Sequence, residues 1–311
     1  MERKVYAIGE AILDIIFKKM DVQAAKPGGA MLNSAVSLAR SGINTTLLSE
    51  YGLDHAGELI DHFLKTNGVH TCKIFRYKEG KTALAMAFLD EKSQASYDFY
   101  KFYPEQRMQI KSPPYIKDDI VLFGSYFGID PRIRSQITNL VTLALQNEAI
   151  IVYDPNFRKP HAHKLNELRP FIRENMKWSH IIRTSHEDLE IIFGEERLSE
   201  LSKQPQAQNK VLILTRGDGK VDLQTPLLSK SYDVKKLPAV STIGAGDNFN
   251  AGLITGLIRE KVDHDRLYKT SEEKWDAIIS YANSFAADAC MSYENYVSVD
   301  FGRQMARKGT E

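Results

Sequence analysis

Short apolar runs rich in β-branched residues alternate with amphipathic segments along most of the chain. A short, continuously apolar run predicts a buried strand, whereas apolar residues three and four positions apart predict one face of a helix. The expected strands are residues 5–9, 45–51, 120–125, 149–154, 180–183 and 211–215, with a small hairpin near 221–224. The expected helices are residues 31–41, 55–66, 131–146, 165–178, 187–193, 245–261 and 271–292. This alternation predicts an α/β fold in which helices cover a parallel sheet.

Residues 73–103 break the alternation, because they carry strand patterns without helices between them. From Thr82 to Phe88 the odd positions are alanines, whereas the even positions carry larger side chains. Such a strand packs on one side and lets another group approach closely on the other. Residues 97–103 add five aromatic side chains. The region is therefore either an antiparallel edge of the main sheet or a β flap over a ligand site.

Composition and charge exclude several classes of protein and of binding partner. The 311 residues are 43% hydrophobic and 26% charged, which excludes a disordered tail, a collagen and a coiled coil. The formal net charge of +1 gives no field toward nucleic acid or an anionic membrane, so neither is an expected partner. Glu10 and Asp14 interrupt the first apolar run too early for a signal peptide. With two cysteines and no CxxC pair, we expect a cytoplasmic protein.

The segment from Ser241 to Asp247, which reads Ser-Thr-Ile-Gly-Ala-Gly-Asp, carries the strongest chemical signal. The apolar spacing that follows predicts a helix starting at about Ala245. Gly244 and Gly246 have no Cβ, so backbone N–H groups there can face an anion. The first N–H groups of a helix lack intrahelical partners, and the helix dipole adds positive charge. The segment therefore predicts a phosphate site. It is not a dinucleotide fingerprint, since Phe249 stands where that motif needs a glycine. Gly80–Thr82 is not the end of a Walker A loop, since Phe75 stands where that loop needs a glycine.

Asp247 indicates more than phosphate binding, because a carboxylate against bound phosphate would repel it. One interpretation is that it accepts the proton of a hydroxyl that attacks the terminal phosphoryl group. The alternative is that it only caps the helix or favours its positive end.

At this point the sequence resembles the PfkB (ribokinase-like) family of carbohydrate kinases. Residues 241–247 are similar to the family signature D-T-x-G-A-G-D, whose last Asp is the catalytic base. Further motifs follow in the family's order over nearly the whole chain: Gly9–Asp14 (G-E-x-x-x-D), Gly28–Asn33 (G-G-x-x-x-N), Gly52–Gly57 (G-x-D-x-x-G), Asp154–Arg158 (D-P-N-x-R) and Leu214–Gly219, which contains T-x-G-x-x-G-like residues. Each motif is weak alone, and their order and spacing make the resemblance specific.

The resemblance implies a ribokinase-like three-layer α/β fold with a mostly parallel central sheet flanked by helices. It implies a single domain over residues 1–311, with a small β-sheet lid formed from about 11–27 and 73–104. It also implies a homodimer joined through that lid.

The resemblance further implies roles for individual residues. Catalysis would involve Asp247, Gly244, Ala245 and Gly246. The sugar would be held by Asp14, Gly28, Gly29, Asn33, Tyr100, Arg158 and Asp247. ATP would be held by Ser185, Thr215, Arg216, Gly217, Gly219, Gly244, Gly246 and Asn283, and Asp188 would hold Mg²⁺ through water. From the residues alone, the Gly pair can equally be a plain turn, Asn33 a helix cap and Arg158 a solvated loop charge.

Several positions depart from the family pattern. Ser241 replaces the first Asp of the signature, which leaves activation by a monovalent cation such as K⁺ open. Ser185 and Asp188 stand where the family has the Asn and Glu of N-x-x-E, so the oxygen ligands reach less far. Lys101 follows Tyr100 where relatives often have Arg, which weakens the case for binding a substrate carboxylate.

The sequence therefore predicts ATP- and Mg²⁺-dependent phosphoryl transfer to a primary hydroxyl of a small sugar. Fructose is the expected sugar, because the glycine, asparagine and arginine motifs look most like those of fructokinases. A 2-keto-3-deoxygluconate kinase shares these features and is the alternative enzyme. A non-catalytic sugar-binding regulator on the same fold is the alternative from another class, and it would bind sugar without forming ADP.

Overall fold

The main sheet runs through the centre of the molecule. A computed structural model describes residues 3–19, 21–89, 95–194, 197–217, 219–235 and 238–308. Within these residues the strands of the main sheet lie in the order β13 (Ser229–Asp233), β12 (Lys220–Gln224), β11 (Val211–Arg216), β10 (Ile181–Ser185), β9 (Ile150–Asp154), β8 (Ile120–Gly124), β1 (Val5–Ile8), β4 (Thr45–Gly52) and β5 (His70–Tyr77). The strands from β11 to β5 pair in parallel, whereas β12 and β13 pair antiparallel. The predicted mostly parallel sheet is confirmed.

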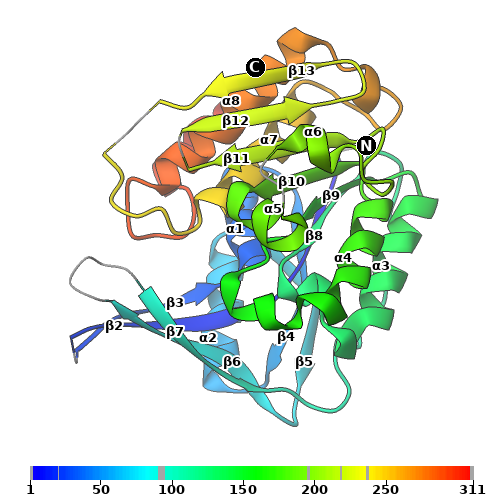
Figure 1. The fold of residues 1–311 in the computed structure, drawn as a ribbon. Helices are drawn as coiled ribbons and strands as arrows, with labels where there is room; N and C mark the ends of the chain where they lie inside the picture. Colours follow the sequence, from blue (N-terminus) through cyan, green and yellow to red (C-terminus); the bar gives the residue numbers. More distant parts are fainter. Residues whose placement is uncertain are drawn as a thin grey trace.

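Helices cover both faces of this sheet, which gives three layers (Figure 1). One face packs against α1 (Ala30–Arg40), α2 (His55–Thr66), α7 (Ala245–Arg259), α8 (Glu272–Ala289) and α9 (Val299–Arg307). The other packs against α3 (Arg134–Gln146), α4 (Leu165–Trp178), α5 (His186–Phe193) and α6 (Leu198–Leu201). In β1, Val5 and Ala7 point into the first core while Tyr6 and Ile8 point into the second. Period-two alternation of apolar residues thus builds both cores from one strand.

A second, smaller sheet stands apart from the first, at the lower left of Figure 1. Its order is β3 (Asp21–Gly28), β2 (Ile12–Lys18), β6 (Lys81–Leu89) and β7 (Ala95–Phe102). β2 and β6 pair in parallel, and the two outer pairs are antiparallel. The interpretation of this region as an antiparallel edge of the main sheet is therefore wrong. Residues 73–77, expected in the smaller sheet, instead belong to β5, because they pair with β4 in the main sheet.

The two faces of β6 differ as its sequence predicts. Ala83, Ala85 and Ala87 are buried, whereas Phe88 on the other face is exposed. Direct pairing places Asp14, Ala85 and Phe99 in one row across the smaller sheet, so these side chains share a face.

The predicted helices are otherwise found within a few residues of their expected ends. The predicted helix 131–146 opens with a 3₁₀ turn at Pro131–Ile133, and the predicted helix 271–292 ends at Ala289. The short helix α6 and the terminal helix α9 had no expected counterpart. In the part of the chain that the structure describes, no helix has both the length and the apolar character to cross a bilayer.

Helices α7 and α8 approach each other closely through glycine. A Cβ atom at position 252 would lie 2.5 Å from the carbonyl oxygen of Tyr281 and 2.6 Å from the α carbon of Ala282. Gly256 makes a similar contact, since a Cβ there would lie 2.8 Å from the α carbon of Ile278. These backbone contacts fix the position of α7 against α8, and so the place of its first turn in the molecule.

We predict that Gly252→Ala lowers the melting temperature, although alanine favours a helix by about 1 kcal/mol over glycine. The added methyl group would overlap the backbone of α8, and packed backbone cannot move aside cheaply. Thermal unfolding followed by circular dichroism measures the effect. Ser280→Ala, on the exposed side of α8, is the matched control and should change the melting temperature little. A Gly252→Ala protein as stable as the wild type would contradict this packing.

Candidate active site

Asp247 lies at the first turn of α7 with its carboxyl group buried. The side chain of Asn33 on α1 donates a hydrogen bond from Nδ2 to Asp247 Oδ2 at 2.8 Å. The neighbouring Ser34 hydroxyl donates to the Asp247 carbonyl oxygen at 2.7 Å. The start of α7 bears no side-chain cap, so Asp247 does not cap this helix, although it is the acidic residue of the first turn and its charge favours the positive end. Two helices that are far apart in the sequence thus hold this carboxyl group in place.

Burial raises the pKa of Asp247 to about 6. Hydrogen bonding from Asn33 and the charges of Arg158 and Arg183 act in the opposite direction, while Asp154 raises the pKa further. The group is therefore largely a carboxylate at neutral pH, yet it is a stronger base than an exposed aspartate.

Asp14, on β2 of the smaller sheet, belongs to the same cluster. Burial raises its pKa to about 7, Arg158 lowers it and Glu10 raises it. Gly28 allows the carboxyl group to lie there, because a Cβ at position 28 would stand 2.2 Å from Asp14 Oδ2. Arg158 influences the pKa of both Asp14 and Asp247, so it links the two carboxyl groups electrostatically.

A buried acceptor in this cluster has no protein partner. Asn33 Oδ1 is inaccessible to solvent and accepts no hydrogen bond from the described residues. Buried polar atoms are normally satisfied, so an orphan of this kind needs an explanation. A ligand hydroxyl group would supply the missing donor.

The glycine segment at the start of α7 packs closely against residues that follow α8. Gly244 has φ +79°, and a Cβ there would lie 2.8 Å from the carbonyl oxygen of Asn295. The side chain of Asn248 donates to the carbonyl oxygens of Gly244 and Asn295, at 2.8 and 2.9 Å. The Ala245 N–H donates to Thr242 at 3.2 Å, within the turn. The helix begins at Ala245 as predicted, which leaves Gly246 and Asp247 as the positions whose N–H groups would meet an anion.

Ser185 and Asp188, expected near ATP and Mg²⁺, form a capping box at the start of α5. Ser185 Oγ lies 2.8 Å from Asp188 Oδ2, and the Asp188 N–H donates to Ser185 Oγ at 3.1 Å. Burial raises the pKa of Asp188, and the charge of Asp154 adds to this effect. These contacts give both residues a structural role, and the metal role of Asp188 stays a prediction.

The other residues predicted to bind nucleotide lie after β11 and on α8. Thr215 Oγ1 accepts a hydrogen bond from Arg183 Nη2, and Arg216 Nη1 lies 3.6 Å from Asp222 Oδ2. Gly217 is exposed with open space around it, and Gly219 has φ +88°. Asn283 is half-buried on α8. Residue 218 of this motif lies outside the described residues.

Two features of the site escaped sequence reasoning. Arg183 is buried in the middle of β10. Glu10 binds the smaller sheet by accepting hydrogen bonds from Lys101 Nζ at 2.6 and 2.8 Å and from the Tyr103 hydroxyl. Tyr100, predicted to bind substrate, pairs with Leu84 and so lies on the face opposite Asp14. The structure does not bring Tyr100 into the cluster, because β7 turns Phe99 to that face instead.

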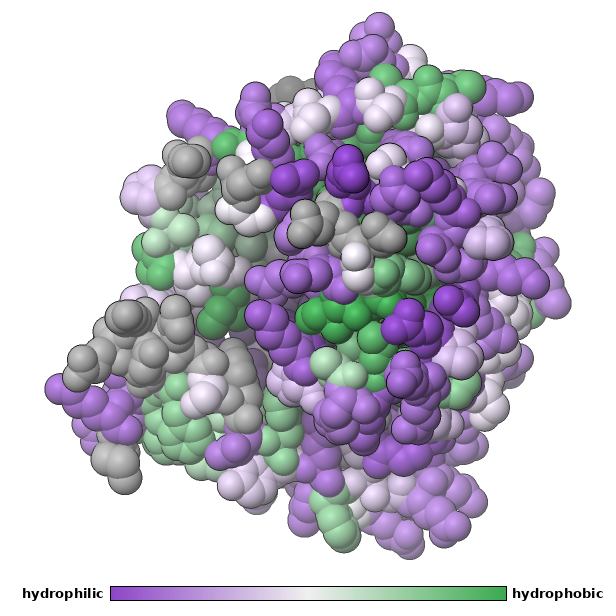
Figure 2. Space-filling model, viewed as in Figure 1, coloured by the Kyte–Doolittle hydropathy of each residue, from purple (hydrophilic) through white to green (hydrophobic). Residues whose placement is uncertain are grey.

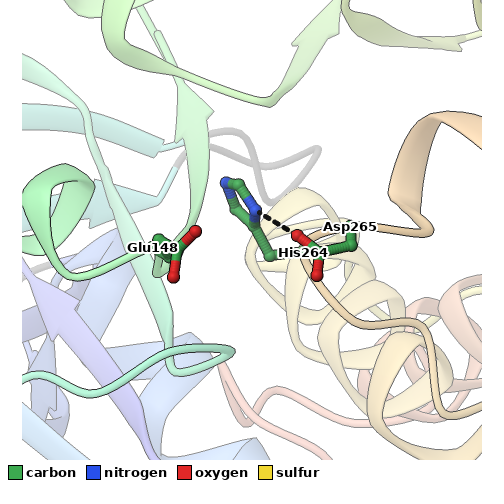
Figure 3. A group of neighbouring side chains, drawn as sticks. All are labelled: Glu148, His264 and Asp265. Atoms are coloured by element: carbon green, nitrogen blue, oxygen red, sulfur yellow. Dashed lines mark hydrogen bonds and ion pairs between the residues drawn. The ribbon is translucent and has the colours of Figure 1, made fainter.

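A separate group of metal-type ligands lies where β8 and β9 begin, at the other end of the sheet. Glu148, His264 and Asp265 point toward one another there (Figure 3). Lys117 Nζ lies 2.7 Å from Asp265 Oδ2 and 3.6 Å from Glu148 Oε2. Its ammonium group supplies the positive charge that these carboxylates need, so the group is an ion-pair cluster.

Comparisons with known proteins agree with this geometry. The model of the pfkB family carbohydrate kinases matches residues 2–298. The chain is 25% identical over 272 residues to fructokinase-2 of Solanum habrochaites, covering 83% of this chain and 82% of the relative. It is 26% identical over 298 residues to probable fructokinase-2 of Arabidopsis thaliana, covering 91% and 88%. Its fold is similar to that of a fructokinase from Vibrio cholerae O395 solved with fructose, ADP and calcium, with TM-score 0.82, 20% identity and coverage of 98% and 99%.

The chain therefore belongs to the pfkB family of carbohydrate kinases. It is a phosphotransferase that acts on a sugar hydroxyl group, and its fold is the ribokinase-like α/β fold. The predicted family and fold class are confirmed.

We predict that Asp247→Asn raises the melting temperature at pH 8. The folded-state pKa of about 6 exceeds the reference value of 3.8, so the charged carboxylate destabilises the fold increasingly as the pH rises through that interval. Asparagine removes this cost, and the gain should shrink as the pH falls toward 4. Thermal unfolding between pH 4 and 8 measures it, with Asp300→Asn on exposed α9 as the control. An Asp247→Asn protein no more stable than the wild type at pH 8 would count against the buried charge.

Proposed function

We propose that this chain transfers the γ-phosphoryl group of ATP to a primary hydroxyl of a small neutral sugar, with fructose as the preferred substrate. The observation that carries the proposal is the buried Asp247 carboxyl group. It is hydrogen-bonded by Asn33 and lies in one electrostatic cluster with Arg158 and Asp14. Relatives that match most of the chain are fructokinases, and one solved protein of this fold holds fructose and ADP.

Asp247 is the general base of the proposed reaction. The sugar hydroxyl gives its proton to the Asp247 carboxylate as its oxygen attacks the γ-phosphorus and the bond from that phosphorus to the β–γ bridging oxygen of ATP breaks. A base whose pKa is about 6 is charged at neutral pH and still accepts a proton readily. Asp14 and the orphan acceptor of Asn33 take hydrogen bonds from other sugar hydroxyls and orient the reacting one.

The start of α7 receives the transferred phosphoryl group. A loose phosphoryl-transfer transition state needs alignment and stabilisation of charge on its oxygens. Backbone N–H groups at Gly246 and Asp247, together with the helix dipole, supply that stabilisation where glycines keep side chains out of the way. Mg²⁺ would be supplied with ATP and would offset the negative charge of its phosphates. We place the base of the nucleotide near Gly217, Gly219 and Asn283.

The charges around Asp14 favour a neutral sugar over 2-keto-3-deoxygluconate. Lys101 is neutralised by Glu10, with which it forms an ion pair of 2.6 Å. Arg158 acts on both Asp14 and Asp247, so carboxyl groups outnumber the cations at the cluster. A substrate carboxylate would therefore meet net repulsion, whereas hydroxyl groups find acceptors.

A sugar-binding regulator without catalysis is the second candidate. Ser241, Ser185 and Asp188 depart from the family pattern, and Ser185 and Asp188 are occupied with each other. The Asp247 carboxyl group argues for catalysis, because a protein that only senses sugar gains nothing from a buried, destabilising base.

ADP formation across a sugar panel tests these proposals. We expect ATP turnover with fructose above that with 2-keto-3-deoxygluconate, ribose, tagatose and nucleosides. Asp247→Asn should reduce turnover by roughly 10²–10⁴-fold, the usual contribution of a general base. Sugar binding measured by calorimetry without ADP formation would favour the regulator, and full turnover by a folded Asp247→Asn protein would refute the role of the base. Repeating the assay with and without K⁺ tests whether a monovalent cation activates the enzyme.

We also propose that two copies of the chain associate through the smaller sheet. Apolar residues lie at the surface of the smaller sheet, at the lower left of Figure 2. Phe17 and Phe88, on the face of this sheet opposite Asp14, stack at 5.1 Å between ring centres, and Val22, which pairs with Phe17, is 60% exposed. An apolar face of this kind is typical of a protein–protein contact.

We predict that the wild type is a dimer and that Phe88→Asp is a monomer, because the new charge would be buried at the contact. Sedimentation equilibrium at micromolar concentration measures the mass. Leu59→Asp places the same charge at an exposed leucine on α2 and should leave the dimer intact. A monomeric wild type would refute the proposal.

A further inference from the structure

Arg183 places a buried positive charge against the glycine segment at the start of α7. Its side chain is only 7% exposed. A Cβ atom at position 246 would lie 2.8 Å from Nη1, 2.9 Å from Nη2 and 3.2 Å from Cζ of Arg183. Because the two nitrogens are nearer to this position than Cζ is, the end of the guanidinium group points at Gly246. Any larger residue at position 246 would push the two apart.

The same guanidinium group connects the ends of two strands. Nη1 donates to Asp154 Oδ2 at 3.0 Å at the end of β9, and Nη2 donates to Thr215 Oγ1 at 2.6 Å on β11. Its Cζ lies 5.6 Å from the ring centre of Phe249 on α7. Arg183 therefore contacts the strand that leads to Arg158, the strand that leads to the proposed nucleotide loop, and the helix that carries the base.

Neutralising Asp154 does not by itself require an arginine here. Asp154 Oδ2 also accepts a hydrogen bond from Asn250 Nδ2 at 2.6 Å, and its Oδ1 accepts one from the Asn156 N–H at 3.1 Å. A lysine would supply one positive charge to this carboxylate. Only a planar fork donates to Asp154 and Thr215 at once with its end against Gly246.

We propose that Arg183 is a positioning residue for phosphoryl transfer, which fixes the glycine segment and adds positive charge behind the N–H groups that receive the ATP phosphates. The inference rests on the proposed kinase function. It predicts an effect on ATP kinetics rather than on sugar binding, because Arg183 contacts Gly246 and Thr215. Within the described residues, Arg183 makes no hydrogen bond or ion pair with the proposed sugar ligands Asp14 and Asn33. The charge of Arg183 also favours the carboxylate form of Asp247, alongside Asn33 and Arg158 and against Asp154.

Steady-state kinetics of Arg183→Met and Arg183→Lys test the inference. With ATP varied at saturating fructose, Arg183→Met should lower kcat/KM for ATP by about 10²-fold, the scale expected when catalytic alignment is lost, and leave KM for fructose unchanged. The acid limb of its pH profile should move to higher pH. Arg183→Lys should restore the acid limb, because the charge is kept, but should recover only part of kcat/KM for ATP, because the fork is lost.

Two further variants separate positioning from general stability. Arg134→Met removes another largely buried arginine, which is bonded to Gly128 and Glu174, and should change neither the ATP kinetics nor the pH profile. The double variant Arg183→Met/Asp154→Asn removes both charges of the ion pair. It should regain stability without regaining kcat/KM for ATP. Recovery of wild-type ATP kinetics in the double variant would overturn the inference, since Arg183 would then only neutralise Asp154.

The wild type in the same assay distinguishes the two proposals. A wild type that forms no ADP with any sugar refutes the kinase function. An active wild type beside a folded Arg183→Met protein with unchanged ATP kinetics and pH profile refutes the role of Arg183. Calorimetric titration with Mg·ADP tests that role without turnover: Arg183→Met should bind more weakly than the wild type and Arg134→Met, and equal affinity would overturn the inference.

Discussion

The carboxyl group of Asp247 is kept out of water at the start of α7, and the surrounding structure compensates for this burial. Asn33 donates a hydrogen bond to it, while Arg158 and Arg183 contribute opposite charge. The compensation is partial, because the pKa remains raised to about 6. Incomplete compensation is what a general base needs, since a fully stabilised carboxylate would be a weaker base. Stability is given up here for reactivity, as is common at active sites.

The rest of the fold holds this group at the junction of three parts. The glycine contacts between α7 and α8 fix the helix that carries it, and α1 brings Asn33 to it. The smaller sheet brings Asp14, and the Glu10–Lys101 ion pair ties β7 to the segment before β2. Ligands of open α/β sheets bind outside the carboxyl ends of the strands. Asp154 and Thr215 lie at those ends, and Arg183 donates a hydrogen bond to each of them. The proposed catalytic and ligand-binding residues therefore lie near the end of the sheet at which such folds bind ligands.

Local patterns sufficed to predict much of this arrangement. The spacing of nearby residues predicted the start of α7 and most of the helices. The family resemblance predicted, from the sequence alone, that Asp14, Asn33 and Asp247 share one site. The position of β5 was missed, because period-two alternation identifies a strand without saying which sheet it joins. Tyr100 was assigned to the site although the register turns it away. Arg183 left no local signal, since its partners Asp154, Thr215 and Gly246 come from three separate segments.

The most direct test of the central claim is a crystal structure with fructose and a non-hydrolysable ATP analogue. The account predicts one primary hydroxyl oxygen of the sugar within about 3 Å of the Asp247 carboxylate, with the γ-phosphate of the analogue against the backbone N–H groups at the start of α7. A complex in which both ligands are bound and Asp247 touches neither would contradict the account.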